Sequence, residues 1–200
     1  MSEDKTLVST IVTPEFVMAF PNLFEAKPFM RNGKPKGEPV FGMTMLFAAA
    51  DVQVLKDKAA EVARARWPGR AFGELKFPFK DGNAEAAKAK ANKKDGSFYE
   101  GKVVVKTSSK FQPQVVDENK NPILDKSKIY SGCYGFAELN FVAYDGVDGG
   151  KDGVKAYVNF VMKSRDGKRI AGKDAASVFA GIKGGKSDKD PTADDDDIPF

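Results

Sequence analysis

Apolar and polar residues alternate along much of the chain, which is the pattern of β-strands with one buried face. In residues 41–47, every second residue is Phe or Met. Similar apolar or alternating runs predict further strands at 7–12, 16–20, 102–107, 111–116, 130–144 and 154–162. The two longest strands flank a Gly- and Asp-rich loop at 145–153 and are predicted to form a hairpin.

The same alternation predicts which side chains face the core. In residues 102–107, Val103 and Val105 are expected to point inward, and Val104 outward with the lysines. In the predicted hairpin, the side chains expected to face inward are Ala137, Leu139, Phe141, Ala143, Val154, Ala156, Val158 and Phe160.

One stretch has helical periodicity, because apolar residues recur at positions 52, 55, 59 and 62. We expect a helix that Asp51 caps and that continues to about Arg66. Trp67, which ends it, is expected to pack as a core or hinge residue rather than to stack on a base. Residues 83–94 are rich in Ala and Lys without large apolar residues, so they predict a mobile basic loop or a short exposed helix.

The remaining segments predict loops, a short helix and a tail. Residues 22–39 are rich in Pro, Gly and Lys and indicate a long loop, and Asp166-Gly167 indicates a turn. A short helix is expected at 174–179. The predicted domain spans residues 1–183, and residues 184–200 form a flexible acidic tail.

Many short strands with one inserted helix and long basic loops predict a β-rich α+β fold. The simplest candidate is an antiparallel, five-stranded Greek-key barrel of the OB type. The pattern alone also fits other small barrels.

The charge of the chain is unevenly distributed. Residues 184–200 contain two lysines and six aspartates, which gives them a net charge of −4. The whole chain has a net charge of +4, so residues 1–183 carry +8. A basic body with an acidic tail is typical of proteins that bind a polyanion. The alternative is that the lysines only keep the body soluble.

Composition argues against several other classes of function. The chain has no histidine and one cysteine, Cys133, so no zinc site, disulfide or histidine-based catalysis is expected. It also lacks phosphate-binding glycine motifs. We therefore predict a protein that is not an enzyme and needs no cofactor or metal. The single cysteine, the polar N-terminus and the lack of a membrane-length apolar run favour the cytoplasm.

Lysines and aromatic residues are interleaved in several segments. If the polyanion is a single strand of nucleic acid, binding it without reading sequence needs cations along the phosphates and flat rings that stack on bases. The residues predicted to do this are Lys76, Phe77, Phe79, Lys80, Tyr99, Lys102, Lys106, Lys110, Phe111, Lys128, Tyr130 and Tyr134. Core packing is an equal alternative for Phe77, Phe79 and Phe111, whereas Tyr99 and Tyr130 are expected to be exposed.

The chain ends in an acidic segment with an apolar tip: Asp194, Asp195, Asp196, Asp197, Ile198, Pro199 and Phe200. Such a tip suits a pocket with apolar walls and a basic rim on a partner protein. It resembles the C-terminal tip of bacterial single-stranded DNA-binding proteins, which recruits replication and repair enzymes. The alternative is a tail that only aids solubility.

A second resemblance rests on short motifs, which are Phe77 to Gly82, Ser108-Ser109, Gln112 to Asp117, Tyr130 to Tyr134, Tyr144 and Gly153-Val154. They are similar to a family of bacteriophage single-stranded DNA-binding proteins, over about residues 5–182. The resemblance implies an OB fold and binding to single-stranded DNA with little sequence preference.

These patterns together predict a phage single-stranded DNA-binding protein of replication, recombination and repair. It would protect single strands and recruit replication and repair proteins through its tail, which would also compete with DNA for the basic groove. One alternative is an adaptor or inhibitor that uses only the tip. A second is a metal-dependent nuclease, and exposed hairpin edges could pair two copies into a homodimer.

Overall fold

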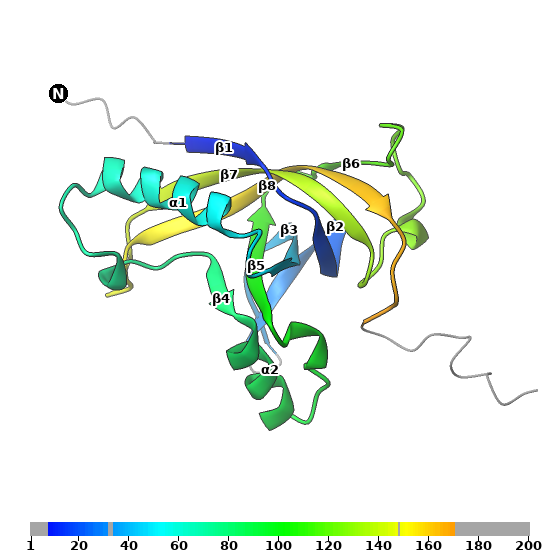
Figure 1. The fold of residues 1–200 in the computed structure, drawn as a ribbon, viewed down its shortest axis with the longest axis horizontal. Coiled ribbons are helices and arrows are strands. Elements are labelled where there is room, and N and C mark those ends of the chain that lie inside the picture. The colour runs from blue at the N-terminus through cyan, green and yellow to red at the C-terminus, as the bar shows by residue number, and fades with distance from the viewer. Residues whose placement is uncertain (1–7, 32–33, 148, 171–200) are drawn as a thin grey trace, which may run out of the picture.

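The computed structural model describes residues 8–31, 34–147 and 149–170. The α-helices are α1 (Gln53–Arg66) and α2 (Gly82–Ala91), and the 3-10 turns are η1 (Phe72–Glu74), η2 (Ser97–Tyr99) and η3 (Lys126–Lys128). The strands are β1 (Val8–Val12), β2 (Phe16–Arg31), β3 (Lys34–Ala48), β4 (Phe79–Asp81), β5 (Lys102–Ser109), β6 (Gln114–Val116), β7 (Tyr134–Tyr144) and β8 (Gly153–Arg165) (Figure 1).

Five strands close into a barrel in the order β2, β3, β5, β8, β7 and back to β2. Four of these pairings are antiparallel, and the seam between β5 and β8 is parallel, with Thr107 beside Ala156. Outside the ring, β1 pairs with β7, β6 with β8 and β4 with β5. The predicted OB-type barrel is confirmed, with the correction that its seam is parallel.

The barrel interior and one helix make the main core. Phe16, Met45, Phe47 and Phe141 are fully buried inside the barrel. Leu55 and its neighbours at helical spacing are buried too, and α1 lies along β1 and β7 (Figure 1). The predicted apolar face of this helix is therefore confirmed.

The expected N-cap of this helix is wrong. The helix begins at Gln53, and its N-cap position is occupied by Val52, which is buried and makes no side-chain cap. Asp51 instead lies in the preceding turn, where its N–H donates to Ala48 O at 3.1 Å. With Val52 buried at the N-cap position, the helix starts one residue later than it would if the Asp51 carboxylate were the cap.

The predicted inward orientation of Phe160 is also wrong, whereas the predicted outward orientation of Val104 is confirmed. Phe160 is 50% exposed because Glu138 pairs with Phe160 whereas Leu139 pairs with Val158, so Asn159 is an extra residue that resets the alternation. Val104 does face outward, but it is buried with Ala19 and Leu46 in a second apolar cluster on the barrel surface.

Residues 22–39 are not the expected loop. They extend β2 and β3 into a two-stranded arm with shifted register, in which Lys27 pairs with Val40 and Arg31 with Lys34. Proline is tolerated because each arm strand has a free edge where its missing N–H costs no ladder bond.

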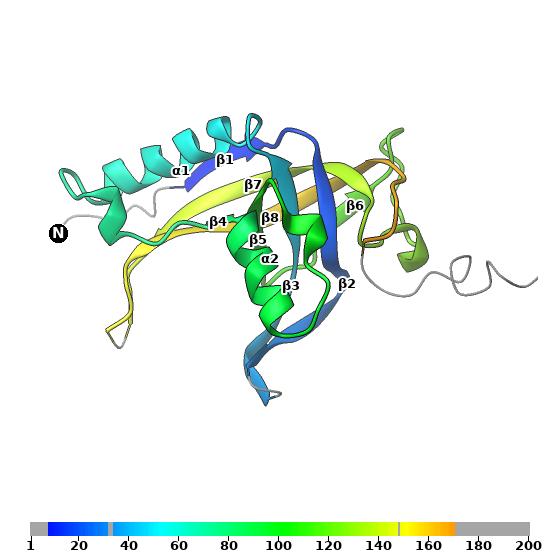
Figure 2. The same ribbon diagram turned by 60° about the horizontal axis from the view of Figure 1, so that its bottom comes forward.

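The Ala- and Lys-rich segment is the helix α2, so the described part of the chain has two α-helices where one inserted helix was expected. Figure 2 shows it beside β4 and β5, on the outside of the barrel. Over the described part of the chain, neither helix has the length and apolar character needed to cross a membrane. The predicted helix at 174–179 and the tail at 184–200 lie outside the described residues.

Candidate nucleic-acid interface

A groove of about 540 Å³ runs over the outer face of β2, β3 and β5. We call it the barrel groove. It combines aromatic rings, cations and small polar groups, from Phe20, Asn22, Lys27, Pro28, Val40, Phe41, Gly42, Met43, Thr44, Lys106, Thr107 and Ser108. In OB-type barrels this face, with the adjoining loops, binds oligonucleotides.

Phe20 is the aromatic side chain most clearly presented to this groove. Its φ of +50° is unusual for a residue with a side chain, and it lies where the β2–β3 register shifts after Ala19. Its N–H donates to Ser131 Oγ at 2.9 Å. The bulge leaves the ring 47% exposed and free on one side to stack on a base.

Phe20, Lys27 and Phe41 were not among the binding residues predicted from the sequence. Phe20 ends a predicted strand, and Lys27 lies in what was expected to be a loop. Pro21 and the run of Pro, Gly and Lys that follows it were the only signals of an irregular strand there.

The floor of the groove is flat because β3 and β5 approach each other closely at Gly42. A Cβ on Gly42 would lie 2.3 Å from the carbonyl oxygen of Thr107. Thr44 and Ser108, on the same outward face of β3 and β5, add small hydroxyls to this floor. A base or a phosphate can therefore approach the strands without meeting a large side chain.

Lys106 joins the groove to a cluster of lysines. Glu85 Oε2 lies 3.0 Å from Lys106 Nζ, and its Oε1 lies 3.0 Å from Lys88 Nζ and 3.8 Å from Lys80 Nζ. Burial would raise the pKa of Glu85, but the hydrogen bonds from Lys106 and Lys88 outweigh it and lower the pKa to about 2. Burial and the nearby charge of Lys106 lower the pKa of Lys80.

The segment that includes α2 and η2 adjoins the groove through the contact of Phe98 with Phe20. Phe98 and Tyr99 pack on the outer cluster of Ala19, Leu46 and Val104. Tyr99 is half-buried rather than exposed, and this burial raises the pKa of its hydroxyl. Its ring therefore packs on this cluster instead of standing free for a base.

Besides Lys106, three predicted residues lie on β5 or just after it. Lys102 is half-buried at the start of the strand. Lys110 is exposed and pairs with Glu38 of the β3 arm at 2.8 Å. Phe111 is 84% exposed, so core packing is excluded for it and its ring is free to stack.

Phe77 and Phe79 belong to the core side rather than to the groove. The Phe79 ring packs against Phe141 with centroids 6.1 Å apart, and Phe77 packs edge-on against Phe72 at 5.7 Å. Both rings line a separate hollow of about 400 Å³ against α1. Lys76 is exposed, but its backbone is held to the start of β8.

Tyr130 and Tyr134 are stacked under cations of the chain itself. The guanidinium of Arg169 lies 4.2 Å from the centre of the Tyr130 ring, and that of Arg165 lies 3.4 Å from the centre of the Tyr134 ring. The Tyr130 hydroxyl donates to Asp166 at 2.8 Å. Burial and this hydrogen bond raise its pKa to about 12.

These contacts fix the last described segment against the barrel. Ile170 packs on the same outer cluster as Phe98, and its N–H donates to Ser131 O at 3.1 Å. Lys128 is exposed, while its carbonyl oxygen accepts from Lys163 Nζ at 3.0 Å. Tyr130 and Tyr134 therefore hold the last described residues against the barrel. Tyr130 is half-buried instead of exposed.

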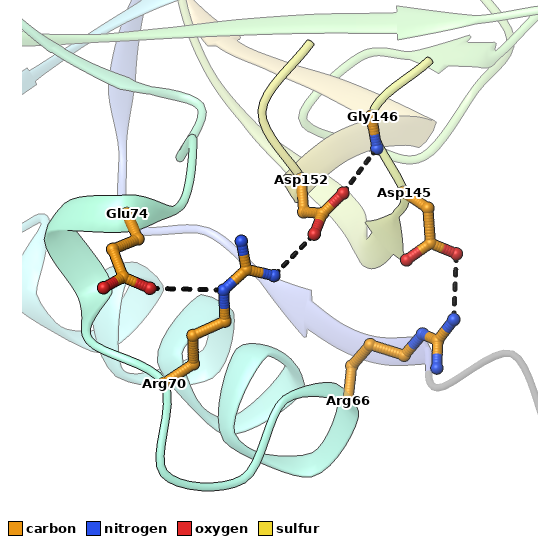
Figure 3. Close-up of polar contacts among 6 residues, drawn as sticks. All are labelled: Arg66, Arg70, Glu74, Asp145, Gly146 and Asp152. Atoms are coloured by element: carbon orange, nitrogen blue, oxygen red, sulfur yellow. Dashed lines mark hydrogen bonds and ion pairs between the residues drawn. The ribbon is translucent and has the colours of Figure 1, made fainter. Parts of the chain in front are cut away.

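The turn between β7 and β8 is tied to the end of α1 (Figure 3). Arg70 Nη1 donates to Asp152 at 2.5 Å, Arg66 donates to Asp145 at 2.8 Å, and Asp152 also accepts the N–H of Gly146. The hydrogen bond from Arg70 is the main reason that the pKa of Asp152 is lowered. In OB-type barrels the corresponding loop adjoins the binding face, and here these ion pairs fix its base.

Within residues 8–31, 34–147 and 149–170, no three His, Cys, Asp or Glu side chains gather in a way that could hold a metal ion. The aspartates at 194–197 lie outside those ranges.

A closed five-stranded barrel with an aromatic and basic groove on its outer face defines a protein of the oligonucleotide-binding class. The family model described as the ssDNA-binding protein of Enterobacter phage Enc34 matches residues 9–194. The chain belongs to that phage family.

Individual phage proteins are also similar to this chain. Putative protein p50 of Acyrthosiphon pisum secondary endosymbiont phage 1 is 28% identical over 172 residues, which cover 80% of this chain and 86% of the relative. The Enc34 single-stranded DNA-binding protein, solved in complex with ssDNA, is 16% identical with a TM-score of 0.63, over 84% of this chain and 99% of that one.

A second solved structure has the same fold. It is gp2.5, a single-stranded DNA-binding protein encoded by bacteriophage T7, with 12% identity and a TM-score of 0.57. The match covers 92% of this chain and 100% of that one. At these identities, the two structural matches establish the fold.

Proposed function

We propose that this protein binds single-stranded DNA in the barrel groove with little sequence preference. The observation that carries the proposal is that one groove on the barrel face combines the exposed ring of Phe20 with Lys106 and the flat floor at Gly42. Stacking and phosphate contacts of this kind are tolerant of base identity. Membership of a phage ssDNA-binding family supports the same function.

The proposed role is in replication, recombination and repair of phage DNA in the host cytoplasm. The protein would coat and protect single strands and would not itself catalyse a reaction. The acidic tip, from Asp194 to Phe200, would recruit replication and repair proteins, with Phe200 in an apolar pocket and the aspartates against a basic rim.

The same tail is proposed to compete with DNA. Four aspartates resemble a run of phosphates, and a tethered competitor acts at an effective concentration on the order of mM. Ile170, the last described residue, packs on the same apolar cluster as Phe98, whose ring contacts Phe20 of the groove. The described part of the chain therefore ends close to the groove, which supports competition by the tail of the same chain.

The test is fluorescence anisotropy of labelled oligo(dT) with the full chain and with a chain ending at Lys183, across a salt series. We expect binding that weakens steeply with salt, and tighter binding without the tail at low salt. Equal affinities of the two chains would refute the competition but not the groove. Binding by neither chain would refute DNA binding and favour the adaptor that acts only through its tip.

A further inference from the structure

Three lysines from separate elements converge on one carboxylate at the edge of the barrel groove. Lys80 lies on β4, Lys88 on α2 and Lys106 on β5, and all three form ion pairs with Glu85. The Glu85 side chain is only 11% exposed, whereas the lysine side chains remain substantially exposed. We call Lys80, Lys88 and Lys106 the lysine cluster.

The lysine cluster has a surplus of positive charge. Three ammonium groups share one carboxylate, which leaves a local charge of +2. Among the described residues, no other carboxylate forms an ion pair with any of the three. The lysines therefore repel one another, and an anion between them would be favoured.

The location of the cluster indicates which anion this is. Lys106 also lines the barrel groove, beside Thr44 and Ser108 of its floor. Lys80 and Lys88 lie beyond Lys106, toward α2. A strand of DNA in the groove would therefore bring its backbone past the exposed ammonium groups.

We propose that the lysine cluster is a binding site for a backbone phosphate of single-stranded DNA, and that Glu85 is its positioning residue. The proposal rests on the proposed function and adds Lys88 and Glu85 to the interface. Glu85 offers one oxygen to Lys106 and the other to Lys88 and Lys80, so it holds the three side chains in place before DNA arrives. The phosphate then supplies negative charge that balances the positive charge left over after pairing with Glu85.

The test compares Lys88→Ala with Lys90→Ala in the full chain, by anisotropy of labelled oligo(dT) between 50 and 200 mM salt. Lys90 is a matched control because it is an exposed lysine on the same helix, and within the described part of the chain no ion pair holds it. Losing one phosphate contact should reduce the slope of log affinity against log salt concentration by about 0.7 in magnitude. The loss of affinity between the two salt concentrations should therefore shrink by about 2.5-fold. Lys90→Ala should leave the slope unchanged.

The role of Glu85 is tested by repeating both substitutions in a Glu85→Gln background. If Glu85 positions Lys88, the difference between Lys88→Ala and Lys90→Ala should disappear there. Equal slopes for the two variants in the otherwise unchanged protein would overturn the phosphate site. A difference that persists in the Gln background would overturn the role of Glu85, and failure of the unchanged protein to bind oligo(dT) would instead refute the proposed function.

Discussion

The ring of Phe98 meets the ring of Phe20 edge-on, with centroids 6.0 Å apart and planes at 61°. Phe20 belongs to the bulge in β2, and Phe98 to the segment with α2 that lies outside the barrel. This contact joins the segment that includes α2 and η2 to a residue that lines the barrel groove. It supports Phe20 on one side and leaves the remainder of the ring available for a base.

We first predict that Phe20→Ala weakens binding of oligo(dT) by about 1–3 kcal/mol, the contribution of one stacked base. The matched control is Phe160→Ala, because Phe160 is equally exposed but does not line the groove. Anisotropy titrations at fixed salt measure both variants. Equal losses in the two would show that Phe20 has no special part in binding.

The second prediction concerns the floor of the groove. Gly42→Ala should force β3 away from the carbonyl oxygen of Thr107, lower the free energy of unfolding by about 1–3 kcal/mol and weaken DNA binding. Gly73→Ala is the control, because no atom lies within 4 Å of its added Cβ. Urea denaturation and oligo(dT) titration of both variants provide the measurements. A neutral Gly42→Ala would contradict the close approach.

The third prediction separates the core aromatic residues from the groove. Phe79→Ala should remove a ring that packs on Phe141 and reduce the free energy of unfolding by about 1.5–3 kcal/mol. The folded variant should bind oligo(dT) with nearly unchanged affinity. Phe111→Ala should do the reverse, because its exposed ring contributes little to stability. A large loss of affinity in Phe79→Ala, at temperatures where the variant is folded, would show that Phe79 takes part in DNA binding after all.

How far the sequence predicts the fold depends on the kind of feature. Strict alternation in 41–47 and 137–143 correctly identifies strands and their buried faces, because half-buried strands need that pattern. Alternation gives no information about an inserted residue, so the bulge at Asn159 and the exposure of Phe160 were not predictable. The paired arm within residues 22–39 was not predicted either, because Pro and Gly there indicate a loop and interrupt the alternation.

The candidate site was harder to predict than the fold. Lys106, Lys80 and Phe111 were selected for their place among lysines and aromatic residues, and the structure leaves them exposed. The same pattern also selected Phe79 and Tyr130, because neighbouring lysines do not reveal what covers a ring. Phe20 has no lysine beside it and reaches the groove only through a backbone bulge, a tertiary feature.

The fourth prediction is a dependence of stability on pH. Glu85 has a pKa of about 2 in the folded protein against its ordinary value of 4.5, so the unfolded state binds its proton first as pH falls. The stabilisation by Glu85 is therefore complete above pH 4.5 and is lost progressively between pH 4.5 and about 2. The difference in free energy of unfolding between the unchanged protein and Glu85→Gln should shrink over that range.

The control for this experiment is Glu100→Gln, which removes an exposed carboxylate of the neighbouring segment. Urea denaturation at a series of pH values measures all three proteins. A constant difference for Glu85→Gln across the acid range would mean that its ion pairs with the lysine cluster do not stabilise the fold.

The parallel seam between β5 and β8 has a consequence for synthesis. The floor strands β2, β3 and β5 are complete when the ribosome has passed Ser109, but the ring closes only when β8, ending at Arg165, has been made. Until then, the inward faces of these strands have no closed core to cover them. Pairing between distant segments is slow, so the nascent chain should complete the barrel, and with it the proposed DNA-binding groove, only late in synthesis.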